Sequence, residues 1–221
     1  MTNRPFSTPP QPAFPFSGPL PGAGRPVRGL FVSRSSVLLS SGFAHRSAEP
    51  PHGAERALLA TFAPEALRML FRAGQHGWTL YLVGNEDSVA RGRVSDSAWE
   101  KFEADLMRRL RGEGIPITRH YACVDHPKGK GKHQRDSVFR FPNTGALYHA
   151  AQEDGIELRE SWVVSGDTDE LAAGWRAGCR TARVGAGPTR KHELAVEPDL
   201  AGNDLARTLA EVFGSDEFSR A

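Results

Sequence analysis

The sequence predicts an α/β fold, in which a parallel sheet is flanked by helices on both faces. Short apolar, β-branched segments alternate along the chain with longer segments of helical periodicity, which is the pattern of repeated βαβ units. The chain has 221 residues, of which 39% are hydrophobic, and this is enough for one such domain with additional segments at its ends.

The first half of the chain begins with residues 28–39, an apolar and β-branched run interrupted by serines, which we expect to be a strand. Residues 65–73 place three apolar side chains on one face before Gly74, as expected for a helix and its end. The run at 78–83 is apolar on both faces, as in a buried strand. A helix is expected from Ser95, which suits the N-cap position, to residue 110.

The second half of the chain continues this alternation. Strands are expected at residues 118–123, 161–164 and 180–184, and helices at residues 145–153 and 170–177. A further short helix is expected around residues 205–213. Because ligand sites of parallel sheets lie beyond the carboxyl ends of the strands, function is expected in the segments that directly follow the first four strands.

The first 27 residues differ from the rest in composition. Half of the 16 prolines lie within residues 1–28, and proline fixes φ and removes a backbone donor. We therefore expect a disordered Pro-rich arm at residues 1–27, a domain at residues 28–188, and a C-terminal helix and tail at residues 189–221. An alternative role for the arm is docking to a protein partner, since Pro-rich segments lose little entropy when they bind in a groove.

The composition excludes several classes of protein. No run approaches the ~20 consecutive apolar residues that a membrane-spanning helix needs, and the N-terminus lacks the pattern of a secretory signal. Two cysteines cannot form a disulfide framework, and a formal net charge of +2 does not by itself indicate nucleic acid. We therefore expect a cytoplasmic protein with no membrane partner.

Five short segments at the predicted strand ends form a recognisable series. They are FVSRSSVL at 31–38, GNEDSVARG at 84–92, CVDHP at 123–127, SVFRFPNTGAL at 137–147 and VSGDTDELAAG at 164–174. In this order and spacing they resemble the haloacid dehalogenase superfamily, and more narrowly its heptose-bisphosphate and histidinol-phosphate phosphatase branch. That branch carries FLDRDGTL, TNQSGIARG, CPHHP, CxCRKPxPGML and VGDxxxDxxAG. The resemblance implies the Rossmann-like fold of that superfamily.

The resemblance also assigns catalytic positions, and the chain departs from the family pattern at each of them. The two acids of the DRD motif, which are the nucleophile and the general acid/base in the family, are Ser33 and Ser35 here. The hydroxyl residue of TNQ, which holds the transferring phosphoryl group, is Gly84. The lysine of RKP, which neutralises the phosphate, is Phe141.

The metal-binding acids of the resemblance are altered as well. The acidic pair of GDxxxD, which helps to hold magnesium in the family, falls on Gly166 and Glu170, and a one-residue slip would offer Asp167 instead. Asp167, Asp169 and Glu170 are weak candidates for metal ligands, and capping of a helix N-terminus is the other role that their position favours. We therefore expect no cofactor.

These losses predict a protein that has lost hydrolysis and binds a phosphorylated ligand or a protein partner. The retained Asn85, Arg91 and Arg140 are the candidate ligand-binding residues, since arginine forms bidentate bonds with phosphate. One alternative is an active sugar-phosphate phosphatase with a non-standard nucleophile, which would need magnesium and an acid close to Ser33. Another is a scaffold that acts through the Pro-rich arm.

The structural zinc site that the resemblance implies is also altered. Of its four ligand positions only Cys123 keeps its residue, and the others are Asp125, Ser137 and Phe139, so we expect no zinc. His126 and His133 are the available substitutes. The basic run KGKGKHQR at 128–135 is expected to be a mobile exposed loop, with an anion contact as the alternative. Nucleic acid is not expected, because no aromatic residues interleave with these cations.

Overall fold

The computed structural model of the chain describes residues 26–38, 62–185 and 196–218. Residues 1–25 of the Pro-rich arm, on which the predicted docking to a protein partner depends, lie outside the described residues. Within them, no helix combines the length and apolarity needed to cross a bilayer.

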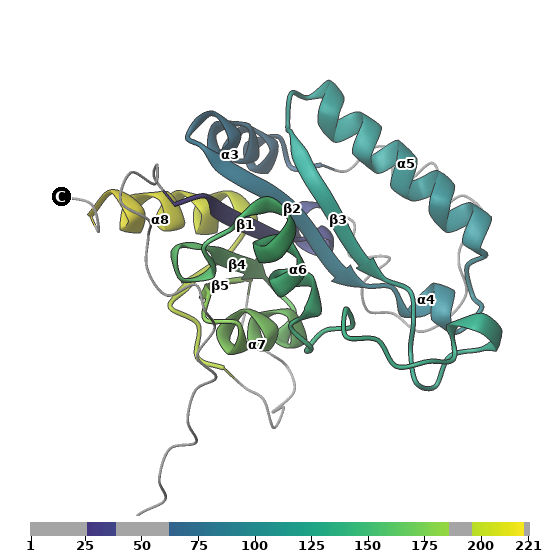
Figure 1. The fold of residues 1–221 in the computed structure, drawn as a ribbon. Helices are drawn as coiled ribbons and strands as arrows, with labels where there is room; N and C mark the ends of the chain where they lie inside the picture. Colours follow the sequence, from purple (N-terminus) through teal and green to yellow (C-terminus); the bar gives the residue numbers. More distant parts are fainter. Residues whose placement is uncertain (1–25, 39–61, 186–195, 219–221) are drawn as a thin grey trace, which may run out of the picture.

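The fold is built on a six-stranded sheet, in which every neighbouring pair of strands is parallel. The order across the sheet is β3-β2-β1-β4-β5-β6 (Figure 1). The strands are β1 (Arg28–Ser33), β2 (Trp78–Asn85), β3 (Ile117–Cys123), β4 (Trp162–Ser165), β5 (Arg180–Val184) and β6 (Leu200–Gly202). This confirms the α/β fold with a parallel sheet that the alternation of segments predicts.

Helices cover both faces of the sheet. They are α1 (Arg34–Val37), α3 (Pro64–Gln75), α4 (Asp87–Ala90), α5 (Asp96–Gly112), α6 (Gly145–Asp154), α7 (Thr168–Arg176) and α8 (Leu205–Phe218), with single 3₁₀ turns at Gly131–His133 and Leu158–Glu160. Helices α3, α5 and α8 pack on one face, and α6 and α7 pack on the other. Both faces of the central strands are therefore buried.

The alternation of side chains along β1 explains this two-sided core. Leu30 and Val32 belong to the cluster formed with α3, α5 and α8, whereas Phe31 points the other way and joins the cluster formed with α6 and α7. The Phe31 ring stacks on Tyr81 of the neighbouring β2, with 4.6 Å between the ring centroids. A run of consecutive apolar residues is what a strand buried on both faces requires.

Most expected elements are present with ends shifted by a few residues, and Ser95 caps α5 by accepting a hydrogen bond from the Ala98 amide at 3.2 Å. Two segments differ from expectation. The strand expected to run to residue 39 ends at Ser33 and is followed by the short helix α1. The C-terminal segment, expected to be a helix and tail, also contributes strand β6, which pairs with β5 while α8 packs against α3.

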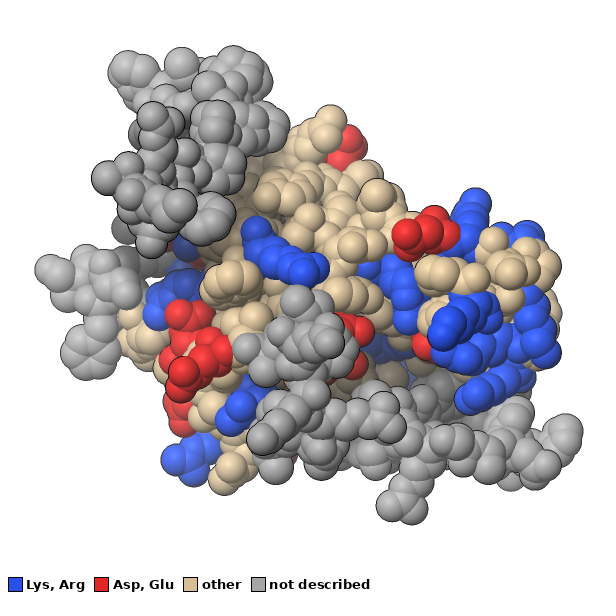
Figure 2. All heavy atoms as spheres, turned by 90° about the horizontal axis from the view of Figure 1, so that it is seen from below, with Lys and Arg blue, Asp and Glu red and all other residues tan. Residues whose placement is uncertain are grey.

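The carboxyl ends of β1 and its neighbours lie at one edge of the sheet. Ser33 pairs with Val83 of β2, and Asn85, two residues further along, pairs with Cys123 of β3. The segments that follow β1, β2, β3 and β4 therefore meet at this edge, as parallel pairing requires. Figure 2 shows the molecule from this side.

Candidate functional site

The two serines that stand in the DRD motif lie at the end of β1. Ser33 is the last residue of the strand and is fully buried, whereas Ser35, in the first turn of α1, is exposed. Their Oγ atoms are 2.9 Å apart, within hydrogen-bond distance. Each serine hydroxyl therefore has the other as a partner, and neither position supplies a negative charge.

A buried carboxyl group from α7 faces these serines. Glu170 accepts a hydrogen bond from the Ser165 hydroxyl at 2.6 Å through Oε2, and the Ser33 hydroxyl also hydrogen-bonds to this carboxyl group. Burial, followed by the nearby charge of Asp167, raises the pKa of Glu170 to about 8, against the opposing hydrogen bonds and the charge of Arg34. Glu170 is therefore mostly protonated and uncharged at neutral pH.

Gly84, at the position of the hydroxyl residue of TNQ, lies between Glu170 and the side chain of Arg34. A Cβ atom added at Gly84 would be 3.5 Å from Glu170 Oε1 and 3.7 Å from Arg34 Cζ, which are ordinary contact distances. Gly84 thus has room for a side chain but offers no hydroxyl group. The backbone there brings the uncharged carboxyl of Glu170 close to a buried cation.

That cation, Arg34, points into the protein and not out of the site. Its guanidinium forms an ion pair with Glu86 at 2.7 Å, and both side chains are buried. It also lies over the Trp99 ring, 4.7 Å from the ring centroid. Burial lowers the pKa of Arg34, while the carboxyl groups of Glu86 and Glu170 oppose that shift. Its charge is thus balanced internally by Glu86.

Sequence reasoning missed this inward-facing pair. Arg34 is the fourth residue of FVSRSSVL and Glu86 is the third residue of GNEDSVARG, so both lie within the segments that carry the family resemblance. The available signal was their position directly after two neighbouring strands, which brings opposite charges to the same edge of the sheet. Ser165, the hydrogen-bond donor to Glu170, was missed in the same way.

The acids expected as weak metal candidates divide into different roles. Asp167 is the N-cap of α7 and accepts hydrogen bonds from the backbone amides of Asp169 at 2.8 Å and Glu170 at 3.3 Å. This is the helix-capping role that the sequence favours. Gly166, the other position of the acidic pair, is exposed and has no side chain to offer.

The donor set at this edge offers few anionic ligands. Magnesium prefers anionic oxygen ligands in octahedral geometry; here two ligand positions are serines, burial raises the pKa of Glu170 to about 8, and one oxygen of Asp167, Oδ1, accepts from two backbone amides. In the part of the chain that the structure describes, no three His, Cys, Asp or Glu side chains are grouped so as to hold a metal ion.

Phe141, at the position of the family's phosphate-neutralising lysine, is a core residue. Its side chain is 1% exposed and packs in the cluster formed with α6 and α7. The Asn85 amide fixes the backbone of Phe141, since Nδ2 donates to its carbonyl oxygen at 2.9 Å and Oδ1 accepts from its N–H at 3.0 Å. Asn85 is a candidate for ligand binding, but both polar atoms of its side-chain amide hold the Phe141 loop in place.

The two arginines expected to bind a ligand share one carboxylate. Arg140 donates a hydrogen bond to Asp87 at 2.7 Å, and Arg91 lies 3.6 Å from the other oxygen of Asp87. Burial alone would raise the pKa of Asp87, but Arg140, His126 and Arg91 lower it below its usual value. One carboxylate thus faces two guanidinium groups and an imidazole, and the structure brings Arg91 and Arg140 together.

The segment at the family's zinc position is held by ion pairs. The His133 ring lies between two carboxylates, with Nδ1 at 3.2 Å from Asp125 and Nε2 at 2.7 Å from Asp96. Asp125 also accepts a hydrogen bond from Arg135 at 2.8 Å. These contacts tie the loop to the first turn of α5. The lysines of the loop are exposed, as predicted, and its mobility stays a prediction.

The remaining positions of the zinc site have structural partners. The buried Cys123 thiol points to the backbone oxygen of Asp125 at 3.6 Å. Phe139 stacks with Tyr121, with 6.3 Å between the ring centroids, and Ser137 accepts a hydrogen bond from the Phe139 amide. His126 Nδ1 accepts from the Lys128 amide at 2.7 Å and does not approach Cys123 as a substitute ligand.

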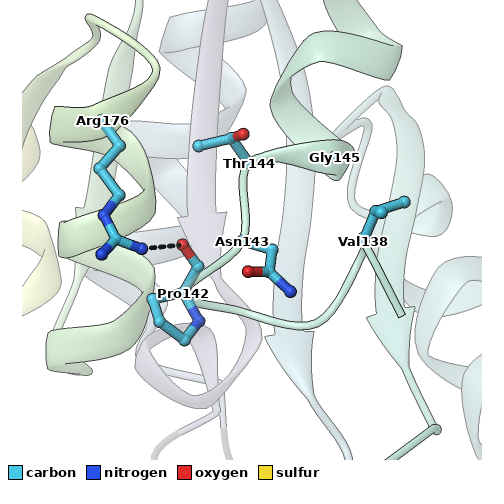
Figure 3. A pocket seen from close by; sticks show the side chains of 6 residues that line it. All are labelled: Val138, Pro142, Asn143, Thr144, Gly145 and Arg176. Atoms are coloured by element: carbon cyan, nitrogen blue, oxygen red, sulfur yellow. Dashed lines mark hydrogen bonds between the residues drawn. The ribbon is translucent and has the colours of Figure 1, made fainter. Parts of the chain in front are cut away.

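A separate pocket of about 460 Å³ lies beside α6 and α7 (Figure 3). It is lined by Val138, Pro142, Asn143, Thr144, Gly145 and Arg176. Arg176 donates a hydrogen bond to the carbonyl oxygen of Pro142 at 3.3 Å across one side of it. None of the site residues that the sequence predicts lines this pocket, so it is distinct from the strand-end site.

Comparison with known proteins gives consistent similarities. No family model matches the chain. A D-glycero-β-D-manno-heptose-1,7-bisphosphate 7-phosphatase of Mesorhizobium japonicum is 30% identical over 139 residues, which are 62% of this chain and 62% of that protein. An enzyme of the same name from Haemophilus ducreyi is 28% identical over 58% of this chain and 72% of its own length. The chain thus spans somewhat less than two thirds of the first of these relatives.

Solved structures agree on the fold. A Mesorhizobium loti protein described as a HAD-like phosphatase has 23% identity and a TM-score of 0.66, covering 89% of this chain and 90% of its own. The D,D-heptose 1,7-bisphosphate phosphatase of B. bronchiseptica, solved with magnesium and phosphate, has 20% identity and the same TM-score, covering 85% of this chain and 99% of its own. At these identities the likeness shows a shared fold.

Proposed function

We propose that this protein, which belongs to the haloacid dehalogenase superfamily beside the heptose-bisphosphate phosphatases, does not hydrolyse phosphate esters. It would instead bind a phosphorylated ligand or a protein partner. One observation carries the proposal. The positions of the family's nucleophile and general acid/base hold Ser33 and Ser35, whose hydroxyls are 2.9 Å apart, and the acid that faces them, Glu170, is buried and accepts a hydrogen bond from Ser165. We call Ser33, Ser35, Ser165 and Glu170 the serine–Glu170 cluster.

The chemistry of phosphoryl transfer explains why this cluster opposes hydrolysis. The reaction needs a positioned nucleophile, and a metal and cations that neutralise the phosphoryl oxygens. A serine hydroxyl attacks only when a base takes its proton, and Glu170 at neutral pH mostly holds a proton itself. Arg34 is paired with Glu86, and Phe141 brings no charge. Because these groups act as a unit in catalysis, their joint loss supports the absence of turnover.

The retained arginines support the binding part of the proposal. Arg91 and Arg140 both face Asp87, so one carboxylate balances only one of the two guanidinium charges. An incoming phosphate would compete with Asp87 for a bidentate bond to one of them. A partner protein with an exposed carboxylate would bind the same arginines. A binding screen is therefore needed to identify the ligand, because the geometry fits both.

The test is an assay of phosphate release. The purified protein is incubated with heptose 1,7-bisphosphate, histidinol phosphate or an aryl phosphate, with and without magnesium. We expect release no faster than that of the Ser33→Ala variant, because no ionised nucleophile is present. Magnesium-dependent turnover by the natural chain that disappears in Ser33→Ala would contradict the proposal.

A second candidate function is hydrolysis with a non-standard nucleophile, and one observation favours it. Glu170 hydrogen-bonds to Ser33, which is the convergence of an acid on a serine that such a mechanism needs. The Asp167 carboxylate caps α7, and Asp167 contacts the cluster through its backbone, whose N–H donates to Ser165 Oγ at 2.8 Å. Under this alternative the rate would rise with pH as Glu170 ionises near pH 8, and the rise would be absent in Glu170→Gln.

The scaffold role of the Pro-rich arm and a cytoplasmic location remain predictions from the sequence. Deleting residues 1–25 removes the arm and leaves the described domain intact. Loss of partner capture in this deletion, with capture retained when Arg140 is replaced by Gln, would assign binding to the arm. The opposite pattern would assign it to the strand-end site.

A further inference from the structure

Cations gather at one side of the strand-end surface, over α4 and the loop that follows β3 (Figure 2). We define the basic edge as Arg93, Lys128, Lys130, Lys132 and Arg135, all of which are exposed. The whole chain has a formal net charge of only +2. Because the basic edge alone holds five cations, the remainder of the chain is net negative, and the positive potential is concentrated here.

Two members of the basic edge, Lys132 and Arg135, have carboxylate partners, and the exposed Asp136 accepts a hydrogen bond from the Ser137 amide at 2.9 Å. Asp87 faces Arg140 and Arg91, Asp125 is 7% exposed and faces His133 and Arg135, and Asp96 faces His133 and Lys132. Among the described residues, no carboxylate lies within ion-pair distance of Arg93, Lys128 or Lys130. These three cations are therefore available to an external partner.

The backbone of the basic edge is held in a defined arrangement. The Lys130 amide donates to the Ala90 carbonyl at 2.8 Å, and the Arg93 amide donates to the Ser88 carbonyl at 2.8 Å, so the loop is anchored beside the end of α4. Gly129 is required for this, because a Cβ atom there would lie 2.4 Å from the His133 carbonyl oxygen. The Lys130 side chain also lies beside Gly92, since its Cδ would be 3.6 Å from a Cβ atom added there.

The neighbouring histidine reports the positive potential of this surface. His126 is largely buried, and burial lowers its pKa, as do the charges of Arg140, Arg91 and Lys128, with Asp87 acting in the opposite direction. A histidine whose charged form is opposed by three cations lies in a positive field. The geometry of the exposed cations thus agrees with the charge environment beneath them.

We infer that the basic edge is a docking surface for a short acidic segment of a partner protein. Three features favour that occupant. The cations are exposed on a turn and can reach several carboxylates of an extended peptide at once. Residues 124–137 hold no Phe, Tyr or Trp on which bases could stack. The net negative remainder of the chain would repel a long polyanion that extends past the edge.

The test measures binding of a fluorescent ten-residue peptide that contains six glutamates, by anisotropy at low and at physiological salt. The full chain is compared with the double variant Lys128→Gln/Lys130→Gln. A matched control is Arg72→Gln/Arg111→Gln, which removes the same charge from exposed positions at the ends of α3 and α5. A ten-residue glutamine peptide and a ten-nucleotide single-stranded DNA complete the set.

We expect salt-sensitive binding of the acidic peptide that weakens about fivefold or more in Lys128→Gln/Lys130→Gln and by less than about twofold in the control variant. Equal weakening in both double variants would overturn the inference, since the net charge of the protein and not the basic edge would then determine peptide binding. Absence of peptide binding, or tighter binding of the DNA than of the acidic peptide, would overturn it as well. Equal melting temperatures of the variants exclude unfolding as the cause, and the result does not depend on whether the protein hydrolyses phosphate.

Discussion

Replacing Arg34 with Met is expected to lower the free energy of unfolding by about 3–5 kcal/mol. Arg34 and Glu86 are both buried, and their charged groups are 2.7 Å apart. Methionine fills much of the arginine volume but leaves the Glu86 carboxylate buried without a counter-ion, which is the costly half of breaking a buried pair. Urea unfolding at pH 7 measures the change.

A double-mutant cycle separates the charge from the lost packing on Trp99. The Glu86→Gln variant keeps the oxygen that accepts a hydrogen bond from the Ser88 amide at the start of α4 but removes the charge. Arg34→Met/Glu86→Gln should therefore be more stable than Arg34→Met alone. If the free energy of unfolding of Arg34→Met lies within about 1 kcal/mol of that of the natural chain, the guanidinium is not the internal counter-ion of Glu86.

The second large effect is a loss of stability on raising the pH through the titration of Glu170. Its pKa is about 8 in the folded state and 4.5 in its ordinary state, so the folded protein holds this proton more tightly than the unfolded chain does. The stabilisation is fully present below pH 4.5, declines as the pH rises, and is lost above about pH 8. The loss amounts to a few kcal/mol over this range.

The variant Glu170→Gln isolates this dependence. Glutamine has nearly the shape of the protonated carboxyl group and can still accept a hydrogen bond from Ser165, but it does not ionise. Its stability relative to the natural chain should increase between pH 5 and about pH 8 and level off towards pH 9. Parallel stability curves for the two proteins over that range would show that the Glu170 carboxyl group is ionised at neutral pH, against the uncharged cluster proposed for this site.

The sheet could be predicted from the sequence because its strands are buried on both faces. In β1 and β2, consecutive apolar residues alternate between two separate core clusters, and such runs stand out from the polar segments around them. Strand β6 could not be predicted, since Leu200–Gly202 has only three residues and is defined by its pairing with β5. Helix α4 is similarly short, at four residues.

At the site, the sequence could predict which charges are missing but not where the remaining ones point. The replacement of acids by Ser33 and Ser35 is visible in the motif itself. The inward direction of Arg34 depends on Glu86, which is 52 residues away and reaches it only when β1 and β2 pair. Likewise, Asp167 and Glu170 lie in one helical turn, and only the packing of α7 decides that the first caps the helix and the second is buried.

The loop after β3 shows the same limit on local reasoning. A run of lysines and glycines is typical of an exposed loop, and the side chains of Lys128 and Lys130 are indeed exposed. Its anchor is His133, which meets carboxylates from Asp125 in the same segment and from Asp96 at the start of α5. No periodic pattern in the sequence encodes a contact between these separate segments.

The catalytic positions that differ from the family pattern have acquired packing roles. Phe141 fills the core beside α6, and Phe139, at a position of the family's zinc site, stacks on Tyr121. Ser33 and Glu170 satisfy each other's hydrogen-bonding groups inside the sheet edge. The substituted residues are thus integrated into the fold, which supports the loss of hydrolysis proposed above.

Binding of a divalent cation tests the central claim most directly, because it does not require the substrate to be known. Electron paramagnetic resonance measures how much Mn²⁺, which prefers the same oxygen ligands as magnesium, remains free in the presence of the protein. The serine–Glu170 cluster predicts no saturable site, with the same free Mn²⁺ for the natural chain and for Glu170→Gln at pH 7. One saturable site that magnesium displaces, and that is lost in Asp167→Asn or Glu170→Gln, would contradict the account.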